Sequence, residues 1–147
     1  MRPGFGRGET VGGEMEKSKA NFRALREACG MSQADIADEA DVSILSVKKW
    51  ENPNSDIKQP PQDVWDWLVM AYDGIVMDAR EGVEQIMAAR TGQVIALPYY
   101  RTQGELDSVQ LAQGIDEPVG YHNARMRMIA QMLSEREVPY EFVYPVS

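Results

Sequence analysis

Short helical patterns, each followed by a residue that ends helices, succeed one another within residues 17–55. In the first, the apolar residues Phe22, Leu25 and Cys29 recur at spacings of three and four. This spacing places apolar side chains on one face of a helix. Gly30 follows, and glycine readily adopts the left-handed backbone that ends a helix. The pattern therefore predicts a bundle of short helices joined by tight turns.

The next two helices each have a serine at the start. Ser32 opens the second helix, and Asp35 three residues later completes a capping-box pattern. Asp41 ends this helix, because aspartate tolerates the left-handed backbone of a tight turn. Ser43 caps the third helix, which ends before the helix-breaking residues 52–55. Two turns of defined chemistry are thus predicted within about a dozen residues of each other.

The third helix has two chemically different sides. With about 100° between successive residues, one side carries apolar and small residues that can enter a core. These inward residues are Ser46, Val47 and Trp50. The opposite side carries Ile44, Leu45, Lys48 and Lys49. We therefore expect this second side to face solvent or a partner.

The rest of the chain combines one long helix with a small mixed segment. Apolar residues recur every three or four positions over residues 61–90, which predicts one long helix or two nearly continuous ones. The β-rich runs at residues 94–100 and 138–144 predict two strands. Each run contains a proline, so neither is typical of a long central strand. Between them, residues 121–135 form a helical pattern, and residues 102–119 are predicted to be a loop with a short helix.

These elements predict an α+β protein with an N-terminal all-helical bundle and a small C-terminal αβ unit. We expect a flexible tail over residues 1–16, a helical domain over 17–73, a linking helix over 74–90 and the αβ unit over 91–147. The tail holds five glycines and few apolar side chains, too little to offset the entropy of ordering it. A basic arm that reaches a DNA groove through Arg2 and Arg7 is the alternative for this segment.

The negative charge of the chain is unevenly distributed. The net charge is −8, but residues 17–60 carry seven positive and seven negative side chains. Residues 61–147 carry six positive and thirteen negative ones. The first half can therefore still present a basic face to a nucleic acid, whereas the acidic second half is a poor candidate for contacts with phosphates.

The segment from about Asn21 to Leu68 resembles the helix-turn-helix of the lambda-repressor and Cro type, the xenobiotic-response-element family. The resemblance is carried by Gly-Met-Ser-Gln-Ala-Asp-Ile-Ala at residues 30–37, Val-Ser at 42–43 and Val-Lys-Lys-Trp-Glu at 47–51. The chain departs from the family at Asp41, where glycine is usual. The second half is more loosely similar to small phage and bacterial repressors of the anti-CRISPR-associated type, through Tyr99-Tyr100, Gly120-Tyr121 and the apolar helix that follows them.

The resemblance implies a transcriptional regulator that binds double-stranded DNA with its third helix in the major groove. It also implies a homodimer, most simply a repressor. The single cysteine, Cys29, suits a reducing cytoplasm, where we expect the protein to be located. The residues expected to contact DNA are Gln33, Ser43, Ile44, Leu45, Lys48 and Lys49. Gln33 would bind a phosphate, the lysines would meet phosphates or guanine edges, and the aliphatic pair would lie nearest the bases.

Two other functions remain open. The four acidic residues at positions 35–41 and the exposed-looking Ile44 and Leu45 would also suit a protein-interaction module that has lost DNA binding. A ligand-sensing regulator is the second alternative, with Tyr99, Tyr100, Tyr140 and Tyr144 lining a pocket.

No pattern indicates an enzyme. His122, the only histidine, lies far in sequence from the only cysteine, Cys29, so a nucleophile–base pair is not expected. There is no histidine–cysteine cluster for zinc and no phosphate-binding glycine loop. We therefore predict no catalytic residues, no metal and no cofactor. No apolar run approaches the roughly 18 residues of a membrane span, so a membrane partner is not expected either.

Overall fold

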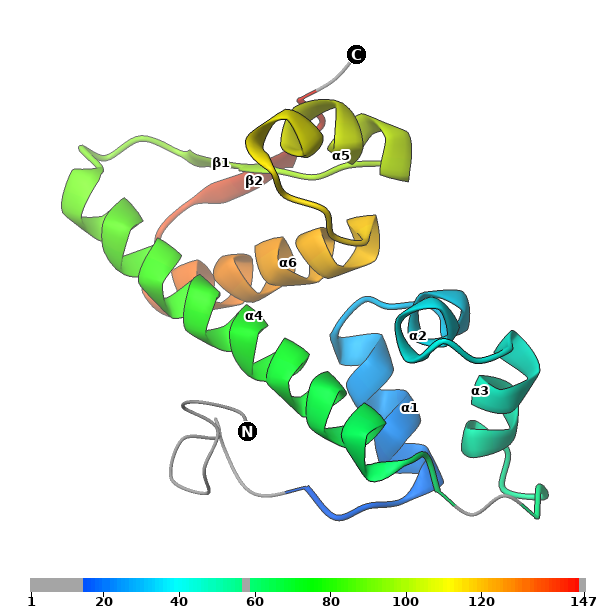
Figure 1. The fold of residues 1–147 in the computed structure, drawn as a ribbon. Helices are drawn as coiled ribbons and strands as arrows, with labels where there is room; N and C mark the ends of the chain where they lie inside the picture. The colour runs from blue at the N-terminus through cyan, green and yellow to red at the C-terminus, as the bar shows by residue number, and fades with distance from the viewer. Residues whose placement is uncertain (1–14, 57–58, 146–147) are drawn as a thin grey trace. The chain divides into compact units, whose positions relative to one another are not determined.

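The computed structural model describes residues 15–56 and 59–145, which divide into two compact units (Figure 1). Unit 1 ends at Gly74 and unit 2 begins at Ile75. The tail predicted over residues 1–16 lies almost entirely outside the described residues. The architecture is α+β, with a helical N-terminal bundle and a two-stranded sheet in the C-terminal unit, as predicted.

Unit 1 consists of three short helices and the beginning of a long one. These are α1 (Lys19–Ala28), α2 (Gln33–Ala40), α3 (Ile44–Glu51) and the first half of α4 (Gln62–Ala89). The predicted helix ends are confirmed: Gly30 and Asp41 have left-handed backbones, with φ of 69° and 55°. Each short helix has a serine cap whose hydroxyl accepts a backbone N–H, and Ser32 and Asp35 form a complete capping box.

The core of unit 1 is built around Phe22, which is fully buried. Its ring meets Trp50 edge-on at 6.1 Å between centroids and Trp65 edge-on at 5.3 Å. Such edge-to-face pairs add stabilisation beyond the burial of apolar area. Helices α1, α3 and α4 are therefore tied together by one aromatic group, which holds the inner face of α3.

Helix α4 is continuous through Gly74 and Gly82 and belongs to both units. Residues 74–90 were predicted as a linking helix. In the structure Ala79 and Val83 of this segment are buried in the core of unit 2. Neither α4 nor any other helix in the described part of the chain is long and apolar enough to cross a membrane.

Unit 2 combines two helices and a single 3₁₀ turn with a small sheet. The elements are β1 (Ile95–Pro98), α5 (Gln103–Gln110), η2 (Leu111–Gln113), α6 (Val119–Glu135) and β2 (Tyr140–Val143). The strands are parallel, and Leu97 lies beside Phe142 in the register. Leu97, Ile129 and Leu133 are among the buried residues of this core, to which the second half of α4 also contributes.

Candidate nucleic-acid interface

The outer side of α3 is exposed, as its sequence pattern predicts. Val47 and Trp50 are buried, whereas Ile44 and Leu45 are 44% and 59% exposed. Lys48 and Lys49 are exposed on the same side of the helix. Two aliphatic side chains and two ammonium groups thus lie together on a helix whose other side is anchored in the core.

The start of α3 is fixed by Ser43. Its hydroxyl accepts the backbone N–H of Ser46 at 3.2 Å and lies 3.2 Å from the Ser46 hydroxyl. A serine cap of this kind stabilises a helix by about 1 kcal/mol. Ser43 is itself exposed beside Ile44. It therefore sits at the edge of the outer surface of α3, where its hydroxyl already has a structural role.

A buried ion pair joins the end of α3 to α1. Arg26 donates from Nε to one Glu51 carboxylate oxygen at 2.6 Å and from Nη2 to the other at 2.9 Å. The two side chains are only 10% and 5% exposed. The guanidinium also donates to the carbonyl of Met31 at 2.9 Å, just before α2. One planar group therefore holds α1, the entry to α2 and the last turn of α3 in a fixed arrangement.

Gln33 lies at the start of α2 and is half-buried. Its Nε2 donates to the same Glu51 carboxylate at 3.2 Å. The amide predicted to bind a phosphate thus donates a hydrogen bond within the protein. The side-chain carbonyl oxygen and the second amide hydrogen of Gln33 can form further hydrogen bonds.

The acidic residues of α2 differ in their roles. Asp35 accepts the backbone N–H of Ser32 at 2.9 Å, so its charge stabilises the start of the helix. Asp38, Glu39 and Asp41 are exposed.

A positive charge lies at the C-terminal end of α3. The Lys19 ammonium donates to the Lys49 carbonyl there at 2.7 Å.

Sequence reasoning missed Arg26 and Glu51 as the residues that position α3. They are 25 positions apart, and neither belongs to a local capping or spacing pattern. For Glu51 the signal was its place in the Trp-Glu pair at residues 50–51 that closes the helix-turn-helix motif, and for Arg26 only its place in the apolar segment that builds the core.

Cys29 is buried in unit 1. Burial, with a further contribution from Asp73, raises the pKa of its thiol to about 12. Its Sγ lies 4.0 Å from the carbonyl oxygen of Leu68. The thiol therefore stays protonated and packs as a small apolar side chain, as the sequence predicts.

A second buried polar cluster lies in unit 2. Burial opposes the ionised form of Glu117, but hydrogen bonds from His122, Arg125 and Gln110 outweigh it and hold the pKa of this carboxyl at about 2. Arg125 donates to both carboxylate oxygens, at 3.2 and 2.7 Å. His122 lies in the first turn of α6 and is buried. The cluster links the segment before α6 to α6 itself.

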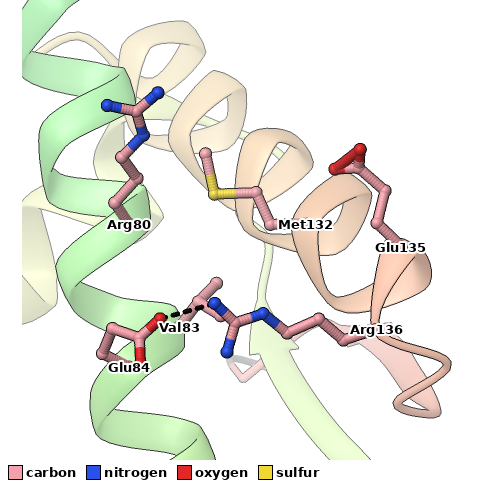
Figure 2. A pocket seen from close by; sticks show the side chains of 6 residues that line it. All are labelled: Arg80, Val83, Glu84, Met132, Glu135 and Arg136. Carbon is pink, nitrogen blue, oxygen red and sulfur yellow. Dashed lines mark hydrogen bonds and ion pairs between the residues drawn. The ribbon is translucent and has the colours of Figure 1, made fainter.

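Unit 2 also has a cleft between α4 and α6, with a volume of about 340 Å³ (Figure 2). It is lined by Arg80, Val83, Glu84, Met132, Glu135 and Arg136, and Arg136 is paired with Glu84 across it. The tyrosines expected to line a ligand pocket are not among these residues. Tyr100 is buried, and Tyr140 and Tyr144 are exposed.

Residues 22–58 match a protein-family model described as helix-turn-helix. This segment covers most of α1 and all of α2 and α3, and it is a helix-turn-helix of the lambda-repressor and Cro type. No curated protein matches the chain. The match lies within unit 1, so the resemblance of the second half to small repressors stays a prediction.

Proposed function

We propose that the protein is a sequence-specific transcriptional repressor that binds double-stranded DNA as a homodimer. The observation that carries this proposal is the outer side of α3 in a segment that matches the helix-turn-helix family. A recognition helix must be anchored on one side and free on the other to enter the major groove. In α3 the anchor is the aromatic group and the Arg26–Glu51 pair, and the free side carries Lys48 and Lys49.

Each residue of the interface has a distinct role in this proposal. Lys48 and Lys49 neutralise phosphates or donate to guanine edges. Gln33 and Ser43 hold phosphates from the first turns of α2 and α3. Ile44 and Leu45 have no hydrogen-bonding groups in their side chains, so the base feature that suits them is the thymine methyl.

A salt titration tests the phosphate contacts. DNA fragments from upstream of the protein's own gene are a suitable probe, because small repressors of the type it resembles often bind there. Lys48→Ala combined with Lys49→Ala should weaken binding to all DNA and reduce the slope of log K against log salt concentration by about one per lost phosphate contact. The matched control is Arg80→Ala with Arg136→Ala, which removes the same charge from unit 2. An unchanged slope in the lysine variant would place these lysines outside the interface.

Uracil substitution tests the contacts to bases. Replacing a thymine with uracil removes only its methyl group, and burying a methyl against an aliphatic side chain is worth roughly 1 kcal/mol. Binding should weaken several-fold at one or more thymines of a mapped site. The loss should shrink when Leu45 or Ile44 is replaced by alanine. Unaltered affinity after substitution of every thymine would exclude this form of readout.

A protein-interaction module is the second candidate function, and the exposed apolar residues Val42, Ile44 and Leu45 favour it. The two functions differ in the salt titration. An interaction module of this kind would show no DNA binding even at low salt, where phosphate contacts are strongest.

A further inference from the structure

The two edges of the small sheet in unit 2 differ in their backbone chemistry. At the outer edge of β1, Pro98 has no N–H, and its carbonyl accepts a hydrogen bond from His122 Nε2 at 3.1 Å. The N–H of Tyr100 donates to Asn123 Oδ1 at 3.1 Å, and its carbonyl accepts from Asn123 Nδ2 at 2.8 Å. Two side chains of α6 therefore close this edge against any further strand.

The other edge, along β2, is open. Ile95 N–H donates to the Pro139 carbonyl at 3.0 Å and Tyr99 N–H to the Val143 carbonyl at 2.8 Å. In a parallel pair these bonds orient the odd-numbered residues of the two strands toward each other. The backbone groups of Tyr140, Phe142 and Tyr144 consequently point away from β1. No further strand joins this sheet among the described residues.

The same three residues carry exposed aromatic side chains. Tyr140, Phe142 and Tyr144 are 37%, 43% and 64% exposed. The Phe142 ring packs edge-on against Tyr99 and Tyr140, at 5.2 and 5.7 Å, so it is held in place rather than free to turn inward. An open strand edge lined with aromatic side chains is a template for another strand. Parallel sheets are almost always covered, and two strands alone are marginal.

We propose that a second copy of this chain completes the sheet, with β2 pairing antiparallel to its counterpart about a two-fold axis at Phe142. In this register Phe142 lies opposite the partner's Phe142, and Tyr140 opposite the partner's Tyr144. All three outward-pointing residues then exchange backbone hydrogen bonds, and the six rings form one continuous row.

Charge selects this register over its neighbour. If the axis passed through Glu141 instead, the two carboxylates would lie directly opposite each other, which is destabilising. With the axis at Phe142, each Glu141 lies opposite the partner's Val143. The sequence of β2 is therefore self-complementary in only one of these two alignments.

The size of the surface indicates a reversible dimer. At roughly 200 Å² for a whole aromatic side chain, the exposed parts of the three rings amount to about 300 Å² per copy. Two copies would bury about 600 Å² of ring surface, which is below the roughly 1,200 Å² of a stable interface. We expect a dimer that dissociates on dilution. Its role in bringing two recognition helices to one operator rests on the proposed function.

Cross-linking tests the pairing and its register. In Phe142→Cys the two α-carbons would be about 5.5 Å apart across the axis, within the range of a disulfide. In the control, Glu141→Cys, the introduced residues are diagonal neighbours about 7–8 Å apart, beyond that range. Under mild oxidation of the full chain, we expect a covalent dimer from the first variant alone. The native thiol of Cys29 is buried and does not compete. A covalent dimer from Glu141→Cys alone would overturn the register, and none from either variant would overturn the pairing.

Sedimentation of uncross-linked protein provides a second measurement. Tyr140→Lys with Tyr144→Lys places like charges opposite each other and should abolish the dimer. Tyr140→Lys with Tyr144→Glu places opposite charges together in the same register and should retain it. Equal sedimentation of the two variants would contradict the alignment. A wild-type chain that stays monomeric at all concentrations would overturn the self-pairing and point to a foreign strand at the open edge of β2. Neither measurement contains DNA, so the salt titration of Lys48 and Lys49 can fail or succeed separately.

Discussion

Replacing either partner of the Arg26–Glu51 pair should destabilise unit 1 far more than replacing both. Glu51→Leu leaves a guanidinium that is about nine-tenths buried, with only the Met31 carbonyl as an acceptor. Arg26→Met leaves a buried carboxylate with only the Gln33 amide. Breaking a buried pair in this way costs about 3–5 kcal/mol, a large part of the roughly 5–15 kcal/mol that stabilises a domain.

The double variant, Arg26→Met with Glu51→Leu, removes both charges and fills the space with apolar atoms. Such replacements are often neutral or stabilising. We therefore expect the free energy of unfolding of the double variant to lie within about 2 kcal/mol of wild type, and the coupling in the double-mutant cycle to be at least about 3 kcal/mol.

Denaturant unfolding followed by tryptophan fluorescence measures this cycle. All three tryptophans, at positions 50, 65 and 67, lie in unit 1, so the signal reports the unit that contains the pair. The control is Arg23→Ala, which removes a pair with Glu27 in which both side chains are more than half exposed. It should cost less than about 1 kcal/mol. Additive effects of the two single changes, or single changes no costlier than Arg23→Ala, would refute the idea that this pair positions α3.

Two further predictions concern titratable groups. Because the pKa of Glu117 is held at about 2 against an ordinary value of 4.5, its stabilisation is present above pH 4.5 and is lost as the pH falls toward 2. Glu117→Gln should therefore flatten the acid limb of the unfolding free energy measured by circular dichroism, and an unchanged limb would argue against the ion cluster. Cys29 should not react with a thiol-specific reagent at pH 8 until the protein unfolds, because its thiol is buried and its pKa is raised to about 12. Rapid labelling of the native protein would contradict the packing of α1 against α4.

The sequence by itself determined the local structure of the helix-turn-helix. The interactions that begin and end α2 and begin α3 join residues no more than five positions apart, as in the capping box of Ser32 and Asp35. Asp41 takes the left-handed backbone expected of it. The two sides of α3 follow from helical periodicity alone, so the exposure of Ile44 and Leu45 needed no knowledge of the fold.

Only the tertiary structure decided what holds these elements in place and which surfaces remain free. The Arg26–Glu51 pair joins residues 25 positions apart, and the pairing of Ile95 with Tyr140 joins residues 45 positions apart. The alternation of side chains in β2 predicted a strand but not its parallel pairing with β1. The register of that pairing depends on how α6 packs and on which edge of the sheet the α6 side chains close. The burial of Tyr100 and the exposure of Tyr140 have the same origin. Side chains of the same residue type are buried or exposed according to the packing around them, and the spacing of residues along the sequence does not encode that packing.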